Sequence, residues 1–144
     1  MSAKVADQTG YEPKILMFAC NWCAYAGLDF AGTSRLTYPA NVSVIRTMCS
    51  GRIDPSFIIK ALTEGVDGVL IGMCNYGDCH YINGNYKAMK RFLLLQKMLE
   101  DFGIARERVR IEGISASEGL KAKQVITEMV ETLRKLGPLK IKEE

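Results

Sequence analysis

Cysteine is the residue type in this sequence with the most scope for chemistry. The chain has five cysteines, an odd number, so they cannot all pair in disulfides. Cys20 and Cys23 are separated by two residues, and Cys74 and Cys79 by four, which are spacings found in chelating loops, whereas Cys49 has no such partner. Five free thiols in one small domain indicate metal binding or redox chemistry. The alternative is that they serve as small, buried apolar residues.

Three chemistries are compatible with these thiols. Four thiolates suit a zinc ion, and they equally suit an iron–sulfur cluster. The C-x4-C and C-x2-C spacings are those of plant-type [2Fe–2S] proteins, here in reversed order. The C-x2-C pair by itself also resembles the dithiol of a thioredoxin, although such an enzyme needs none of the other three cysteines.

Few other residues offer chemistry. His80 is the only histidine, and beside Cys79 it is expected either to donate a hydrogen bond to a bound cluster or to be an ordinary loop residue. Trp22 and Tyr76 lie inside the two chelating loops, where they would shield a cluster from water or simply pack. Ala26 excludes the C-x5-R motif of small phosphatases, and the first loop lacks the Ser/Thr-rich sequence that binds the phosphate of FMN. The sequence contains no Gly-rich phosphate loop of either common type.

Short apolar runs predict the strands that must position these thiols. Four runs have the near-continuous apolar or β-branched character of strands that are covered on both faces: 14–19, 42–48, 68–73 and 109–114. Helical patterns alternate with them: 24–36, 55–65, 85–102 and 115–136. This alternation predicts an α/β fold, a four-stranded parallel sheet with helices on both faces, in the flavodoxin-like order 2-1-3-4.

Capping signals indicate where the helices begin and end. Asn85 is expected to cap the long third helix, and Gly103 to end it. Ser115 and Glu118 form a capping box before the last helix. The apolar face expected of the third helix consists of Met89, Phe92, Leu93, Gln96, Leu99 and Phe102.

All five cysteines follow one of the first three predicted strands. Cys20, Cys49 and Cys74 come directly after the first, second and third strand. Because the carboxyl ends of parallel strands share one edge and adjacent strands are about 4.8 Å apart, these thiols are expected within a few ångströms of one another. Open α/β sheets bind their ligands at this edge.

Composition favours a single globular domain. The chain has 144 residues, of which 48% are hydrophobic and 24% charged, and we expect one domain over 14–137 between a flexible arm, 1–13, and a tail, 138–144. A net charge of +3 is too small to indicate nucleic-acid binding. No apolar run approaches the roughly 20 residues of a membrane span, and the first residues lack the apolar segment of a secretory signal. A cytoplasmic protein without a membrane partner is therefore expected.

Three blocks of sequence carry a resemblance to a known family. They are residues 20–27 (CNWCAYAG), 49–55 (CSGRIDP) and 77–86 (GDCHYINGNY). The chain resembles the delta subunit of methyl-viologen-reducing hydrogenase, a small iron–sulfur protein of methanogenic archaea. The resemblance covers residues 14 to about 95 and is looser in the last strand and helix.

The resemblance implies a function in electron transfer. It implies a [2Fe–2S] cluster, and a carrier of electrons between a nickel–iron hydrogenase and a heterodisulfide reductase during methanogenesis, where hydrogen oxidation drives flavin-based bifurcation. The implied partners are the small subunit of the hydrogenase and the flavoprotein subunit of the reductase. Such a carrier has no catalytic site of its own. From the residues alone, a zinc-stabilised interaction module and a dithiol oxidoreductase remain alternatives.

The cluster needs four ligands, and the chain offers five cysteines. The expected ligands are the two chelating pairs, with Cys49 either beside the cluster or in place of one of them; the pairs are Cys20, Cys23, Cys74 and Cys79. Arg35, Arg46 and Arg52 lie near the cysteines in the predicted fold and are expected as polar contacts at the rim of a partner interface.

Overall fold

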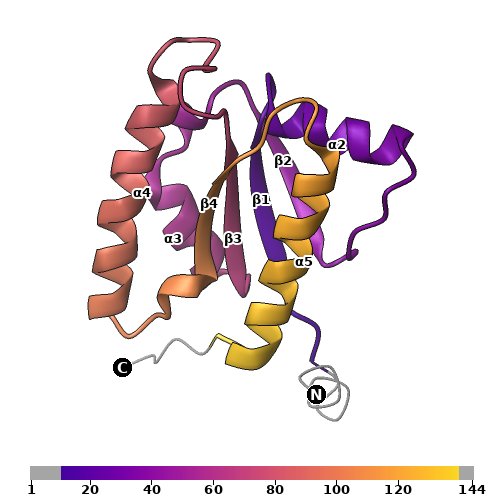
Figure 1. The fold of residues 1–144 in the computed structure, drawn as a ribbon. Helices are drawn as coiled ribbons and strands as arrows, with labels where there is room; N and C mark the ends of the chain where they lie inside the picture. Colours follow the sequence, from indigo (N-terminus) through magenta and orange to yellow (C-terminus); the bar gives the residue numbers. More distant parts are fainter. Residues whose placement is uncertain (1–10, 140–144) are drawn as a thin grey trace.

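A four-stranded parallel sheet forms the centre of the molecule. The structure is a computed structural model that describes residues 11–139. The strands are β1 (Ile15–Cys20), β2 (Val42–Thr47), β3 (Gly68–Met73) and β4 (Val109–Gly113). They are hydrogen-bonded in the order β2-β1-β3-β4, and every neighbouring pair is parallel (Figure 1). The predicted α/β class and the order 2-1-3-4 are therefore confirmed.

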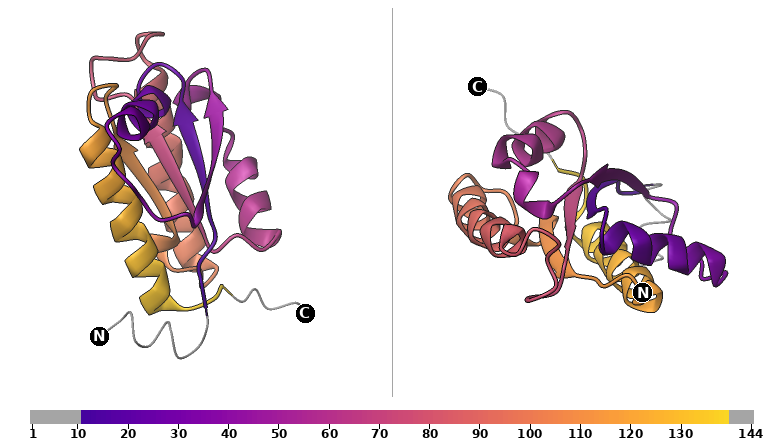
Figure 2. Two further views of the ribbon diagram at one scale, coloured as in Figure 1. Left: turned by 90° about the vertical axis from the view of Figure 1, so that its right-hand side faces the viewer. Right: turned by 90° about the horizontal axis from the view of Figure 1, so that it is seen from above.

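Helices cover both faces of this sheet, as predicted. The helices are α2 (Ala24–Thr33), α3 (Pro55–Thr63), α4 (Gly84–Asp101) and α5 (Gly119–Leu136), and two short 3-10 turns are η1 (Ser50–Arg52) and η2 (Arg106–Arg108). α2 and α5 pack on one face, and α3 and α4 on the other (Figure 2). None of the helices in the described part of the chain is long and apolar enough to span a membrane.

The alternation of side chains along the strands builds one apolar core on each face. In β1, Ile15 and Met17 belong to the core under α2 and α5, whereas Phe18 belongs to the core under α3 and α4. All six residues of β3 are buried, which explains its uninterrupted apolar sequence. Each large apolar side chain buried in this way stabilises the fold by about 1.5–3 kcal/mol.

The helix α4 departs from its predicted start and from its predicted apolar face. It begins at Gly84 with Asn83 as the N-cap, so Asn85 is not a cap but is fully buried in the first turn. Leu93 is 52% exposed, and Phe102 lies beyond the last turn and is 78% exposed. Phe92 and Leu99 are buried as predicted, and Ala88 and Leu95 complete the buried stripe after the first turn. The face is shifted toward Ala88 and Leu95 because helix spacing alone does not determine which row of side chains meets the sheet.

Both described ends of the chain lie at the amino edge of the sheet, opposite the cysteines (Figure 1). Buried Arg108 donates hydrogen bonds to the carbonyl oxygens of Asp67 (3.0 Å) and Gly137 (2.7 Å). The Asp67 carboxylate accepts hydrogen bonds from the backbone N–H groups of Lys14 (2.9 Å) and Leu139 (3.3 Å). This network, the Arg108 network, joins the starts of β1 and β3 to the end of α5.

Most of the predicted arm, 1–13, and of the predicted tail, 138–144, lies outside the described residues. At the described end of the arm, the Glu12 carboxylate accepts hydrogen bonds from Arg134 and Asn41, each at 2.9 Å, and Pro13 is fully buried. The residues just before β1 therefore contact the domain. The boundary between the arm, 1–13, and the domain, 14–137, stays a prediction.

A candidate metal centre at the carboxyl edge

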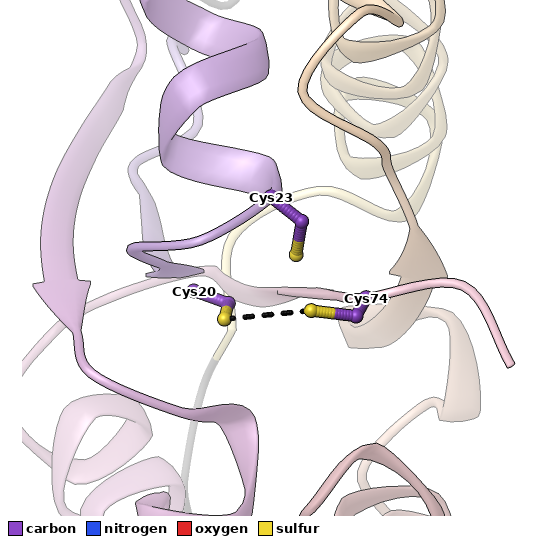
Figure 3. Close-up of side chains that lie close together, drawn as sticks. All are labelled: Cys20, Cys23 and Cys74. Atoms are coloured by element: carbon purple, nitrogen blue, oxygen red, sulfur yellow. Dashed lines mark hydrogen bonds between the residues drawn. The ribbon is translucent and has the colours of Figure 1, made fainter. Parts of the chain in front are cut away.

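Three buried thiols point toward one another at the carboxyl edge of the sheet (Figure 3). The Sγ atoms of Cys20, Cys23 and Cys74 all lie within 4.8 Å of one another, and those of Cys20 and Cys74 are 3.7 Å apart. Cys20 ends β1, a tight turn brings Cys23 over it, and Cys74 follows the neighbouring strand β3. We call these residues the cysteine trio.

The other two cysteines form a second group beside the trio. Cys49 follows β2, Cys79 belongs to the β3–α4 loop (residues 74–83), and their Sγ atoms are 4.0 Å apart. The strand pattern predicts that Cys49 joins Cys20 and Cys74. The structure instead brings Cys23 into the closest group, because β2 ends two residues before Cys49 and the chain turns into η1.

Hydrogen bonding within the trio favours a single negative charge. The Cys23 thiol donates to Cys20 and so lowers the pKa of Cys20 to about 6. The same hydrogen bond, followed by burial, raises the pKa of Cys23, and burial raises the pKa of Cys74 to about 11. Within the trio, Cys20 is therefore the thiol that loses its proton most readily, and Cys23 and Cys74 retain theirs more tightly. A bound metal displaces such protons, because thiols coordinate as thiolates.

Cys49 and Cys79 differ in how well their surroundings accept a negative charge. Burial is the main influence on Cys49 and raises its pKa. Burial acts in the same direction on Cys79, but the backbone N–H groups of Asn85, Tyr81 and Gly84, together with the Cys49 thiol, outweigh it, so its pKa is lowered. The first turn of α4 thus stabilises a thiolate at Cys79.

Gly84 allows α4 to begin directly against these two sulfurs. A Cβ atom at this position would collide with the Cys49 Sγ and would lie 3.3 Å from the Cys79 Sγ. A residue with a side chain would therefore push the helix start and its N–H groups away from the thiols. This role was not predictable from the sequence, since a glycine before a helix is an ordinary feature.

The side chain of Asn85 holds the start of the β3–α4 loop. Its Nδ2 atom donates hydrogen bonds to the carbonyl oxygens of Cys74 (3.1 Å) and Asn75 (2.9 Å). Asn75 in turn donates to Glu118 Oε1 (3.0 Å), which also accepts from the backbone N–H of Ser115 (2.9 Å). The predicted capping box does not cap the last helix, because α5 begins only at Gly119 with Glu118 as its N-cap residue. Its Glu118 side chain instead joins the start of α5 to the cysteine edge.

Aromatic rings connect the two chelating loops. The rings of Trp22 and His80 are stacked, with centroids 3.9 Å apart and planes at 10°, and Tyr81 meets His80 edge-on at 4.9 Å. Tyr76 stacks on Tyr86 at 4.9 Å. The structure therefore places His80, Trp22 and Tyr76 in ring contacts around the loops, and their action on a cluster stays a prediction.

The three arginines expected at a partner interface have different surroundings. The Arg46 guanidinium lies 5.5 Å from the centre of the Tyr25 ring. Arg52 is exposed in η1, three residues after Cys49, and Arg35 is exposed beyond the end of α2. Arg46 and Arg52 thus each lie three residues from Cys49 in the sequence, and Arg35 lies further from any cysteine.

The residues present at this edge fit a group bound through sulfur. The donors are cysteine sulfurs, and soft thiolates select zinc, copper(I) or iron–sulfur clusters. The backbone N–H of Ser50 stabilises the Cys20 thiolate, which places this residue beside the trio. The buried Ser50 hydroxyl has no hydrogen-bond partner among the described residues, as expected of a donor that faces a bound group.

A parallel α/β domain with free thiols gathered at its carboxyl edge defines a class of small proteins whose cysteines could hold a metal. The family described as methyl-viologen-reducing hydrogenase, delta subunit, matches residues 15–137. The chain belongs to this family, as the resemblance in its cysteine blocks predicts.

Relatives of known name agree with this membership. The chain is 57% identical over 130 residues to the iron-sulfur D subunit of the F420-non-reducing hydrogenase of Archaeoglobus profundus, covering 90% of this chain and 95% of the relative. It is 52% identical over 133 residues to the iron-sulfur D subunit of the F420-non-reducing hydrogenase vhc of Methanococcus voltae, covering 92% of each. It is also 46% identical over 140 residues to the A subunit of the ferredoxin:CoB-CoM heterodisulfide reductase of Methanosarcina mazei, covering 95% of this chain but 18% of that protein.

Proposed function

We propose that this protein is an electron-transfer subunit that carries a [2Fe–2S] cluster between a hydrogenase and a heterodisulfide reductase. The observation that carries this proposal is the convergence of five thiols from three consecutive strand–helix loops on one sheet edge. Relatives named as iron-sulfur subunits of hydrogenases support the type of cofactor. When bound, a [2Fe–2S] cluster takes up and releases single electrons.

We propose Cys20, Cys23, Cys74 and Cys79 as the four ligands. The trio supplies three sulfurs within 4.8 Å of one another, and Cys79 supplies the sulfur whose negative charge the start of α4 stabilises. Cys49 then lies beside the cluster, 4.0 Å from the Cys79 sulfur.

The surrounding residues would adjust the redox properties of this centre. Backbone N–H groups directed at thiolate sulfurs stabilise the more negative, reduced state and so raise a reduction potential. The stacked rings of Trp22 and His80 cover the first chelating loop and limit the access of water. The chain thereby contributes ligation, orientation and electrostatics, and no catalytic residue of its own.

The proposed partners are the small subunit of the hydrogenase and the flavoprotein subunit of the reductase, and the proposed location is the cytoplasm. Support for the reductase comes from the Methanosarcina relative. That protein is named as the A subunit of a heterodisulfide reductase, and one stretch of it matches 95% of this chain. Two proteins that occur as parts of one chain are often neighbours when they are separate.

Elemental analysis tests the proposed cofactor. The full chain, purified from its native source without oxygen, should contain about two iron atoms and about two acid-labile sulfides, and it should be brown. Dithionite reduction should bleach the visible absorption and give an electron paramagnetic resonance signal of one unpaired electron. One zinc without sulfide would contradict the proposal in favour of an interaction module, and a colourless, metal-free dithiol would contradict it in favour of an oxidoreductase.

A further inference from the structure

The β3–α4 loop contains a strained turn between Tyr81 and Gly84, whose backbone N–H groups face the Cys79 sulfur. That backbone path does not require an isoleucine at its centre, because glycine accepts the same positive φ. Ile82 has a φ of 75°, and across it the Asn83 N–H donates to the Tyr81 carbonyl oxygen at 2.9 Å. This is a γ-turn of the rare kind whose central residue has positive φ, and a β-branched residue is among the least suited to it. Strain of this kind is concentrated at functional sites.

Within the described residues, no burial of the Ile82 side chain offsets the cost of this strained backbone conformation. Its side chain is 82% exposed, the highest value among the exposed large apolar residues. The loop also projects furthest beyond the carboxyl ends of the strands, as Figure 1 and the left view of Figure 2 show. An isoleucine held in a strained, outward conformation is preorganised to enter a pocket on another molecule.

Exposed aromatic rings belong to the same loop as Ile82 or stack on rings of that loop. The Ile82 surface consists of Ile82 and four half-exposed rings: Trp22, Tyr76, Tyr81 and Tyr86. Ring stacking fixes these side chains in place, so that less conformational entropy is lost when they are covered. Cys79, the least buried of the five cysteines, lies in the same loop. A partner bound here would therefore approach the thiol edge from its most accessible side.

We propose that Ile82 is the anchor by which this protein docks on the A subunit of heterodisulfide reductase, with the surrounding rings as the centre of the interface. This inference rests on the proposed function. The Methanosarcina relative, a protein named as the A subunit, contains a stretch that matches 95% of this chain, and this makes the A subunit the partner to which we commit. The cores of permanent interfaces are more apolar than those of transient ones, which suits an apolar anchor. The fitting surface on the partner is an apolar pocket for one branched side chain.

Basic residues of this chain follow the Ile82 surface along the first half of α4, where they would face the rim of the partner's pocket. Lys87, Lys90 and Arg91 are exposed in the first half of α4, which has no acidic residue in its first turn, and Arg52 is exposed in η1. Asp78 is the acidic residue of the loop itself. The partner pocket should therefore be flanked by carboxylates, and binding should weaken as salt is added.

A pair of matched glycine variants tests the anchor. The full chain with Ile82→Gly or Phe102→Gly is loaded with its cluster, and the dissociation constant for the reductase A subunit of the same organism is measured without oxygen. Phe102 is the control because its side chain is 78% exposed, large and apolar, and lies at the far end of α4. Ile82→Gly should weaken binding by about tenfold or more, as expected of an interface anchor, while Phe102→Gly should bind like the unchanged protein.

Stability and metal content separate docking from a structural role. Glycine accepts positive φ, so Ile82→Gly should melt at the same or a higher temperature and keep its iron, sulfide and visible spectrum. Unchanged affinity would overturn the inference, as would a loss of affinity accompanied by loss of the cluster or by a lower melting temperature. Weakened binding to the small subunit of the hydrogenase or to a second copy of this chain, with reductase binding intact, would also overturn it. Absence of iron from the unchanged protein would contradict the proposed function, whatever the affinities.

Discussion

The Sγ atoms of Cys49 and Cys79 are 4.0 Å apart, yet the surroundings of the two thiols favour different charge states. Burial dominates at Cys49 and favours the neutral thiol, whereas three backbone N–H groups favour the thiolate at Cys79. A bound metal displaces thiol protons, as at Cys23 and Cys74 in the proposed ligand set, so substitution rather than charge state distinguishes these two sulfurs.

Single serine substitutions distinguish these two residues. Cys79→Ser should lose or rearrange the cluster, because a hydroxyl is a poor replacement for a thiolate, whereas Cys49→Ser should keep iron, sulfide and visible absorption near their normal levels. Iron and sulfide contents and spectra of the two variants, purified in parallel without oxygen, provide the measurement. A bleached Cys49→Ser protein beside a normal Cys79→Ser protein would show that our ligand set is wrong.

The first turn of α4 packs directly against the thiols because Gly84 has no side chain. A Cβ atom there would collide with the Cys49 sulfur, and the helix start would have to move away together with the N–H groups that face Cys79. This prediction therefore concerns a whole element, since one methyl group displaces the first turn of an 18-residue helix.

Two Gly→Ala variants measure this constraint. Gly84→Ala should lower the free energy of unfolding by about 1–3 kcal/mol, the usual cost of overpacking, and should shift the reduction potential of the cluster. Gly32→Ala in α2, where a Cβ atom would meet nothing within 4 Å, should instead raise the free energy of unfolding by about 0.5–1 kcal/mol. Chemical denaturation and redox titration provide the two readouts. Equal effects of the two substitutions would contradict the packing that we describe.

The sequence predicted elements better than it predicted their contacts. Strand positions and order were predictable because covered parallel strands are short apolar runs, and every cysteine follows one of them. Asn85 was assigned as a cap because its type and position fit one, whereas its true partners are carbonyl groups of the β3–α4 loop. Ile82 carries no sequence signal for its turn, since positive φ is rare for its residue type.

At the scale of the whole molecule, structural support and chemistry lie at opposite edges of the sheet. The Arg108 network fastens the described ends at the amino edge, and the thiols meet at the carboxyl edge. Damage to the first edge should therefore reduce stability without altering the metal centre.

Substitution of Arg108 tests this separation. Arg108→Met should lower the free energy of unfolding by about 2–4 kcal/mol, because it leaves two carbonyl groups without their charged donor. Arg106→Met is the control: its ion pair with Glu100 at 3.5 Å is exposed, and its loss should cost less than about 1 kcal/mol. Denaturation curves and visible spectra of both variants provide the test. A changed spectrum in folded Arg108→Met would show that the two edges are coupled.

The position of the described chain ends has a consequence for laboratory use of this protein. β1 has six residues and so separates the end near Tyr11 from the thiol edge by about 20 Å. An affinity tag or surface linker that continues directly from either described end, Tyr11 or Leu139, would start at the edge opposite the thiols (Figure 1). Molecules immobilised through such a linker would present Ile82 and the cysteines to the surrounding solution, which suits capture of dissolved partners. Direct wiring to an electrode calls instead for an engineered attachment point on the β3–α4 loop.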